Sequence, residues 1–336
     1  MIRSYGFSII GSSHTKKGSK CQDNNKIITI HKDQMVIAAV ADGVGSCKFS
    51  DISSKIAVEV SAEYCAEKLK VKANFKKGIE NLIEEAFEKV ELEIEKISLK
   101  DNQPLSEYDT TLDLVIYTGK KIFFGHCGDG GIIGLTTKGD YIRVTSIQKK
   151  DGIYVIPLRG GSKKKNNTWA FGSVKDEFSS VLIATDGIYD LFFPYLLKGQ
   201  SIEIYIPLIQ YFMDNNGLHV SAKTIDEISE SRKSFLNSKE CESVTDDKTL
   251  VVLIDETIMP KRKESSFYAE PDWDALLQEW NKKAYPHLYT KTEDTTHEQQ
   301  NNQVKETDES NESVTRKHTI KEISEAIKRY KDNNKA

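Results

Sequence analysis

The chain has 336 residues, a length that suits one large domain or two ordinary ones. Hydrophobic residues make up 38% and charged residues 29%, and the net charge of −4 gives no indication of a nucleic-acid or membrane surface. The five cysteines are scattered without a C-x-x-C pair, which argues against a zinc knuckle or a redox dithiol. The N-terminus lacks a secretion signal, and no run of about 18 apolar residues is present, so we expect a soluble, cytoplasmic protein.

Short β-branched or aromatic runs, bounded by Gly, Asp or Lys, predict strands along much of the chain. The segment TGKK between two of them is typical of a hairpin turn, which favours antiparallel pairing. The expected strands are Tyr5–Gly11, Asn25–His31, Met35–Asp42, Thr110–Thr118, Lys120–Asp129, Gly130–Thr137, Tyr141–Ile147, Ser179–Gly187 and Lys248–Asp255.

Two long segments among these strands repeat apolar residues close to a 3.6-residue period and predict amphipathic helices, Asp51–Lys70 and Phe75–Ile97. Further helices are expected within Ile202–Asn215 and at Lys223–Leu236. Helices grouped in two places, among strands joined by tight turns, favour an α+β fold with outer helices. We therefore expect two antiparallel sheets face to face with helices outside, in a domain that spans residues 1–256.

The composition changes after this domain. Residues 257–289 predict a charged linker with a short helix, and residues 290–316 contain almost no apolar residue, which predicts disorder. Residues 317–336 carry an amphipathic helix. This C-terminal helix suits either a solvated, weakly docked tail or an element that docks a partner.

Aspartates recur at the ends of the predicted strands. A single Asp-Gly pair is usually a plain turn, but several strand-end carboxylates brought together would repel one another unless a cation neutralised them. Oxygen ligands without His or Cys suit Mg²⁺ or Mn²⁺, so the repetition favours a carboxylate metal site. The aspartates in question are Asp23, Asp42, Asp129, Asp186, Asp246 and Asp247.

The ordered series SSHTKKGSKCQD, VADGVGS, TTLDLVIY, GHCGDGG, IATDGIYD and DDKTLVVLI resembles the bacterial form of the PP2C-type (PPM) metal-dependent protein serine/threonine phosphatases. The resemblance covers about Tyr5–Asp255. It implies a four-layer α-β-β-α sandwich with two Mn²⁺ or Mg²⁺ ions between the sheets and a third, weaker ion. It also implies hydrolysis of phosphoserine and phosphothreonine on proteins by a metal-activated bridging water. The expected partners are a phosphorylated protein and an opposing Ser/Thr kinase.

The family's motifs can be carried over residue by residue. Asp42 would supply the bridging carboxylate and Gly43 a main-chain carbonyl, with Asp186 and Asp246 as further metal ligands. Asp247 would then orient the ligand or cap the turn, although the register that makes Asp247 the ligand stays open.

Two other aspartates match weaker positions of the pattern. Asp23 matches the first-motif residue that holds metal-bound water, which would make it catalytic together with Asp42. Asp129 matches the aspartate associated with the third metal. His126 and Cys127, on the strand before Asp129, are interpreted as packing residues because strand alternation or burial explains them.

The sequence also departs from the family pattern. Val44 stands where eukaryotic members often have a histidine, and Gln22 replaces an acidic residue. The usual phosphate-binding arginine is missing from its place, which leaves His14 and Lys16 as candidates for contacting phosphate. The alternatives are strand packing for the histidine and plain solvent exposure for the lysine.

These departures keep other functions open. The lysines of Gly161–Ser173, near the family's mobile flap, suit either recruitment of acidic substrate or a charged solvated loop. A pseudophosphatase that binds phosphoprotein without hydrolysis is the main alternative. A nuclease or other phosphodiesterase would call for a basic groove with stacking aromatics, which the balanced charge does not indicate.

Overall fold

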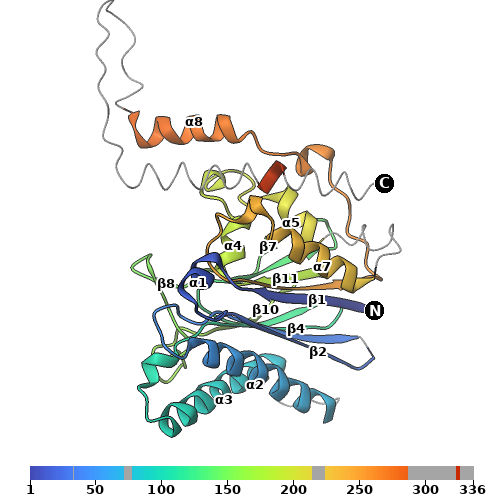
Figure 1. The fold of residues 1–336 in the computed structure, drawn as a ribbon. Coiled ribbons are helices and arrows are strands. Elements are labelled where there is room, and N and C mark those ends of the chain that lie inside the picture. Colours follow the sequence, from blue (N-terminus) through green and yellow to red (C-terminus); the bar gives the residue numbers. More distant parts are fainter. Residues whose placement is uncertain (33, 72–77, 214–223, 287–322, 326–336) are drawn as a thin grey trace, which may run out of the picture.

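The computed structural model describes residues 1–32, 34–71, 78–213, 224–286 and 323–325. Two five-stranded sheets lie face to face at its centre (Figure 1). The first has the strand order β1-β12-β11-β6-β7, and every neighbouring pair is antiparallel. Its strands are β1 (Ile2–Ile9), β6 (Gly131–Thr136), β7 (Tyr141–Arg143), β11 (Phe178–Ala184) and β12 (Lys248–Asp255).

The second sheet has the order β10-β5-β4-β3-β2 and is also antiparallel throughout. Its strands are β2 (Asn24–Ile30), β3 (Met35–Ala41), β4 (Leu112–Tyr117), β5 (Ile122–Cys127) and β10 (Ala170–Ser173). The predicted TGKK turn joins β4 to β5, with Gly119 at φ +80°, a conformation that glycine adopts without strain. A separate ribbon pairs β8 (Lys149–Lys150) with β9 (Tyr154–Val155).

Helices cover the outer face of each sheet (Figure 1). The second sheet is covered by α2 (Ser50–Val71) and α3 (Ile79–Lys100). The first is covered by α4 (Asp186–Phe192), α5 (Ile206–Met213) and α7 (Ile225–Leu236). The remaining helical segments are α1 (Ser12–Lys17), α8 (Trp273–Ala284) and the 3₁₀ turns η1 (Leu105–Tyr108), η2 (Tyr195–Leu197), η3 (Lys239–Cys241) and η4 (Ser265–Tyr268).

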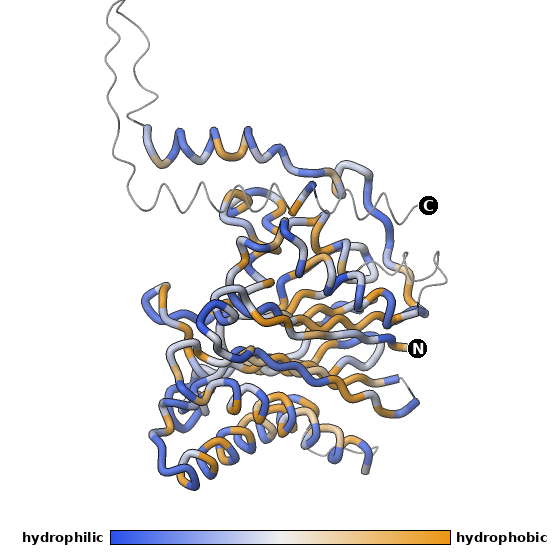
Figure 2. Tube along the Cα trace, viewed as in Figure 1, coloured by the Kyte–Doolittle hydropathy of each residue, from blue (hydrophilic) through white to orange (hydrophobic). Residues whose placement is uncertain are grey.

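Strand alternation sorts the core into three layers. Successive side chains of a strand point to opposite faces, so a strand covered on both faces reads as a continuous apolar run. On β12, Val251 and Leu253 pack between the sheets, whereas Leu250 and Val252 pack against the outer helices. Figure 2 shows the apolar residues concentrated on the strands and on the helix faces toward them. The expected four-layer α+β sandwich is confirmed.

The described part of the C-terminal extension packs on the helices over the first sheet. Trp273 is 7% exposed and Ile323 is 1% exposed, and both belong to the same apolar cluster as Tyr205. The Tyr205 hydroxyl and Trp273 Nε1 both donate to Glu270 Oε1, at 2.8 and 2.7 Å. The stretch predicted to be disordered, and most of the predicted terminal helix, lie outside the described residues.

Three local features differ from the sequence-based expectation. Residues 12–17, inside the first phosphatase-like motif, form the short helix α1. Asp186 begins α4 instead of ending a strand. The strand expected at Tyr141–Ile147 stops at Arg143, and the Ser146 carbonyl beyond it accepts a hydrogen bond from a buried histidine. None of the described helices combines the length and apolar character needed to cross a bilayer.

Candidate active site

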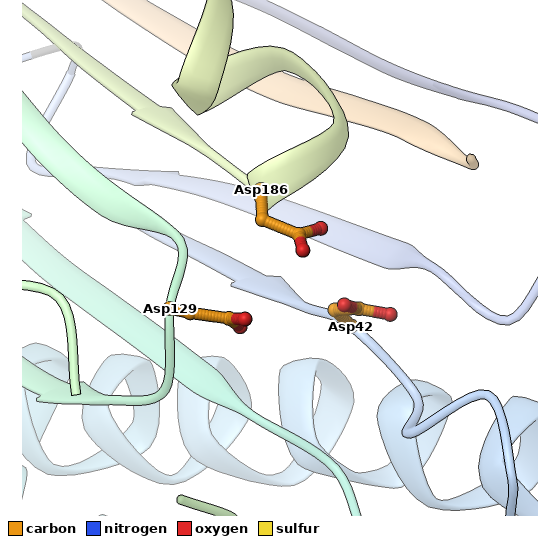
Figure 3. Close-up of side chains that lie close together, drawn as sticks. All are labelled: Asp42, Asp129 and Asp186. Carbon is orange, nitrogen blue, oxygen red and sulfur yellow. The ribbon is translucent and has the colours of Figure 1, made fainter. Parts of the chain in front are cut away.

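Three aspartates from distant parts of the sequence meet where strands of both sheets end (Figure 3). Asp42 follows β3, Asp129 lies in the turn between β5 and β6, and Asp186 opens α4 just after β11. One carboxylate oxygen of each lies within 4.8 Å of the other two. We call these residues the acidic trio; Asp129 is buried and the other two are half-buried.

The backbone of Asp42 is held by the residues that lead into β4. Its N–H donates to Thr111 Oγ1 at 2.9 Å, and its carbonyl accepts from Thr111 N–H and Thr110 Oγ1, both at 2.8 Å. A Cβ on Gly43 would lie 2.5 Å from the carbonyl oxygen of Ser50. Glycine is therefore required there by the close approach of α2, and the role of its carbonyl as a ligand stays a prediction.

Asp186 is fixed by the junction of β11 with α4. As the first residue of the helix, its carboxylate lies at the positive end of the helix dipole. The preceding Thr185 donates its N–H to the Thr249 carbonyl at 3.0 Å. A Cβ on Gly187 would lie 2.1 Å from the carbonyl oxygen of Asp247, so glycine lets α4 approach the loop before β12.

Asp23 lies beside the acidic trio and is 4% exposed. Thr185 Oγ1 donates to Asp23 Oδ2 at 2.7 Å and accepts from Thr249 N–H at 3.2 Å. Asp23 also shares a hydrogen bond with the carboxyl group of Asp42. The first-motif aspartate thus contacts the trio, and its orientation depends on a threonine that the sequence analysis did not single out.

Asp129 is paired with a lysine that sequence patterns also missed. Lys149, on β8, places its Nζ 3.2 Å from Asp129 Oδ2. The other oxygen, Oδ1, is buried and has no hydrogen-bond partner in the described part of the chain. Lys149 belongs to a two-residue strand with no periodicity or motif around it, so the sequence offered no signal for it.

The adjacent aspartates before β12 have opposite environments. Asp247 is 2% exposed and accepts from Gly11 N–H and Gln22 N–H, both at 2.6 Å. His14 Nδ1 lies 2.9 Å from the same carboxylate. Asp246 is exposed, and its charge acts on two members of the acidic trio. Asp247 is engaged in holding the N-terminal loop, which favours the register that makes Asp246 the ligand.

Burial and mutual repulsion disfavour ionisation at this site. The pKa of Asp42 and that of Asp186 are both raised well above the ordinary value, first by burial and then by neighbouring carboxylates. Among the neighbouring carboxylates, Asp23 contributes most to the raised pKa of Asp42, and Asp129 contributes most to the raised pKa of Asp186. Burial raises the pKa of Asp23 to about 7, against hydrogen bonds that lower it. In the metal-free site protonation is therefore favoured over a cluster of unbalanced negative charges.

The residues present fit hard divalent cations. The trio offers oxygen donors alone, the kind of ligand that Mg²⁺ and Mn²⁺ prefer. The unpartnered Oδ1 of Asp129 is a buried acceptor without a donor, and a cation would satisfy it. A cation would also relieve the repulsion that raises the carboxyl pKa values.

The sequence matches the family model described as protein phosphatase 2C over residues 10–221. The chain belongs to the protein phosphatase 2C family. The expected membership and enzyme class, a protein serine/threonine phosphatase, are thereby confirmed.

Solved structures share the protein phosphatase 2C fold with this chain. A bacterial serine phosphatase is 13% identical, with a TM-score of 0.51, and the match covers 78% of this chain and 100% of that one. The serine/threonine phosphatase Stp1 from Staphylococcus aureus is 14% identical, with a TM-score of 0.50 and coverage of 76% and 96%. A C. elegans sex determining protein is 16% identical, with a TM-score of 0.51 and coverage of 75% and 64%. No curated protein matches the chain in sequence.

One arginine lies close to the Asp42–Gly43 turn of this protein phosphatase 2C. Val44, the residue after Asp42–Gly43, donates its N–H to the Asp109 carbonyl at 3.0 Å. Arg159 grips the Asp109 carboxylate with two hydrogen bonds, Nε–Oδ1 at 2.5 Å and Nη2–Oδ2 at 2.8 Å. Both of these guanidinium donors are therefore already hydrogen-bonded to Asp109. This arginine was not among the residues expected from the sequence.

The two candidates for phosphate contact lie in different surroundings. His14 lies against Asp247 in the loop that this carboxylate holds. Lys16, two residues further along α1, lines a separate pocket beside η3 and β12. Their contact with substrate phosphate stays a prediction.

The lysines of Gly161–Ser173 are largely tied to α3. Lys163 pairs with Glu84 and Lys165 with Glu91, each at 2.8 Å. The segment is thus docked on the helix layer at these two positions. Its lysines there are less available for substrate than the sequence-based hypothesis required.

A buried charge pair lies at the same end of the inter-sheet core. His126 is 1% exposed, with Nδ1 2.7 Å from Asp113 Oδ1 and Nε2 2.8 Å from the Ser146 carbonyl oxygen. His126 and Cys127 are both buried, as expected, but His126 also makes polar contacts through both ring nitrogens. Burial lowers the pKa of His126, and the Asp113 carboxylate more than offsets this, so the pKa is raised overall.

Proposed function

We propose that this protein phosphatase 2C hydrolyses phosphoserine and phosphothreonine on proteins with two Mn²⁺ or Mg²⁺ ions. Asp42, Asp186 and Asp246 would hold the ions together with the Gly43 carbonyl, and Asp129 would hold a third, weaker one. The observation that carries the proposal is the acidic trio, each of whose members has a carboxylate oxygen within 4.8 Å of the other two, with Asp129 paired to Lys149.

The bound ions would supply Lewis-acid chemistry, activating water and offsetting negative charge on the phosphoryl group. The protein's own groups position the reactants. Asp23, oriented by the Thr185 hydroxyl, would accept a hydrogen bond from the attacking water. Asp247 would keep the loop of Gly11 and Gln22 in place without entering the chemistry.

The pseudophosphatase alternative finds no support in this arrangement. Its premise was a site impaired by Gln22, Val44 and a missing arginine, yet three of the proposed ligands, Asp42, Asp129 and Asp186, lie close together; Asp246 is not part of this group. A protein without metal chemistry would gain nothing from carboxylates whose repulsion opposes folding.

A metal-dependent assay on full-length protein tests the proposal. We expect turnover of p-nitrophenyl phosphate and of a phosphothreonine peptide with Mn²⁺, loss of turnover in EDTA, and recovery when excess Mn²⁺ is added. Full activity in chelator would contradict the mechanism. Asp176→Asn is the matched control, since this aspartate pairs with Lys138 at 3.9 Å on an exposed turn.

A further inference from the structure

A second pocket, with a volume of about 440 Å³, shares no residue with the acidic trio. It is enclosed by α1, the end of α7, η3 and the start of β12. Three lysines line it, Lys16, Lys239 and Lys248, against one glutamate, Glu242. The charge of this pocket is therefore opposite to that of the metal site.

Lys248 is buried, and no ion pair is found for it within the part of the chain that the structure describes. It pairs with Ile9 across the first sheet and is only 5% exposed. Among the described residues it forms no ion pair within 4.0 Å; the charges of Asp247 and Asp246 act on it from further away, and both oxygens of Asp247 accept backbone N–H groups. Lysine is rarely buried unless it is paired, so this ammonium group calls for an anion from outside the described chain.

Two hydroxyl groups in the same lining also lack partners. Ser12 Oγ and Ser238 Oγ are both buried, and neither has a hydrogen-bond partner among the described residues. A hydroxyl can donate to an anion, and buried polar groups normally have a partner. Lys16 and Lys239 are exposed at the rim, where they add positive charge without desolvation.

We propose that this pocket binds a phosphate group, as a monoester or as the free ion, with Lys248 as the buried charge and Ser12 and Ser238 as hydrogen-bond donors. Several ammonium and hydroxyl donors suit the three terminal oxygens of a phosphate better than the two of a carboxylate. The volume leaves room for the group esterified to the phosphate. The ligand is either a phosphorylated residue or metabolite, or the inorganic phosphate that a phosphatase releases.

The site can be tested on metal-free protein, where the acidic trio repels anions. Full-length protein in EDTA is titrated with O-phosphoserine, inorganic phosphate and serine, following the amide NMR signals of Ser12, Ser238 and Lys239. We expect saturable shifts with a phosphate ligand and none with serine. Tighter binding of phosphoserine identifies a phosphate ester as the ligand, and equal or tighter binding of inorganic phosphate identifies the free ion. Absence of saturable shifts with both would overturn the proposal.

Variants locate the binding and separate it from catalysis. We expect Lys248→Met, which keeps the side-chain volume, to weaken binding about tenfold or more. Lys17→Met, on the same helix but outside the lining, should bind like the wild type. If Lys248→Met does not fold, Lys239→Met at the exposed rim should weaken binding about threefold. Wild-type affinity in the variant that is tested sinks the proposal, whether or not the protein is a phosphatase.

Discussion

The acidic trio and the Asp113–His126 pair lie near the same end of the inter-sheet core, yet their charges are balanced differently. Asp113 is 3% exposed and faces a histidine at 2.7 Å, whose other ring nitrogen is also bonded. Asp42 and Asp186 face other carboxylates. His126 offsets part of the cost of burying Asp113, whose pKa burial still raises, whereas the carboxylates without such a partner depend on a ligand. The contrast therefore distinguishes residues that stabilise the fold, such as Asp113 and His126, from residues whose charge requires a ligand, such as Asp42 and Asp186.

Removing a carboxylate of the trio should give the largest functional effect. We expect Asp186→Asn to lower the Mn²⁺-dependent turnover of a phosphothreonine peptide by about 10³-fold or more, because a neutral amide holds a divalent cation poorly. The measurement is kcat/KM at saturating Mn²⁺. Wild-type rates for this variant would remove Asp186 from the metal site.

The same variant should leave the fold nearly unchanged. It removes a repelling charge but also loses a favourable carboxylate at the start of α4. We expect its metal-free stability to remain within about 1 kcal/mol of the wild type in urea unfolding.

Breaking the Asp113–His126 pair should instead act mainly on stability. His126→Ala leaves Asp113 buried without its partner, and we expect a loss of about 3–5 kcal/mol in the free energy of unfolding. Urea unfolding of the metal-free protein measures it. The double variant Asp113→Asn/His126→Ala should regain part of the loss, because it removes the unpaired charge. A single variant as stable as the wild type would show that the pair contributes nothing.

The contrast between these two regions also marks where sequence reasoning stopped. The apolar runs and the Asp-Gly pairs are local patterns, so the sandwich and the end of β3 could be predicted from them, whereas β11 ends at Ala184 and α4 begins at the second Asp-Gly pair. The partners of the carboxylates could not. Thr185 and Lys149 reach Asp23 and Asp129 across the fold, and the cross-strand pairing of Asp113 with His126 depends on the β4–β5 register.

Lys248 illustrates the same limit more sharply. In the sequence it reads as the polar start of a strand, and its burial is visible only once α7 and η3 cover that face of β12. α1 is a further case, because its six residues are all polar and carry no apolar periodicity that would indicate a helix.

Asp246 and Asp247, which lie side by side before β12, offer a second comparison between a carboxylate that supports the fold and one expected to bind metal. Asp247→Asn leaves a buried amide where two backbone N–H groups need acceptors, and we expect a loss of about 1–3 kcal/mol of stability. Asp246→Asn, at an exposed position, should change stability by no more than about 0.5 kcal/mol while lowering turnover. Urea unfolding and the Mn²⁺-dependent assay are run on both variants. The reverse pattern would assign the ligand to Asp247.

The smallest effect expected is a pH-dependent change in the melting temperature. The pKa of Asp23 rises to about 7 in the folded, metal-free chain from an ordinary value of 3.8, and the pKa values of Asp42 and Asp186 rise as well. Because the folded state holds these protons more tightly, their contribution to stability is present below the ordinary value. It is lost as pH rises through the folded-state pKa.

Divalent cations should reverse this loss by binding the ionised carboxylates. We therefore expect Mg²⁺ or Mn²⁺ to raise the melting temperature by a few degrees more at about pH 8 than at about pH 5.5. Thermal unfolding in EDTA and in excess metal at both pH values measures the difference. His126→Ala should keep this pH-dependent difference while melting lower throughout, because it leaves the trio intact. An equal shift at both pH values would mean that the ions bind away from the buried carboxylates, where protons do not compete with them.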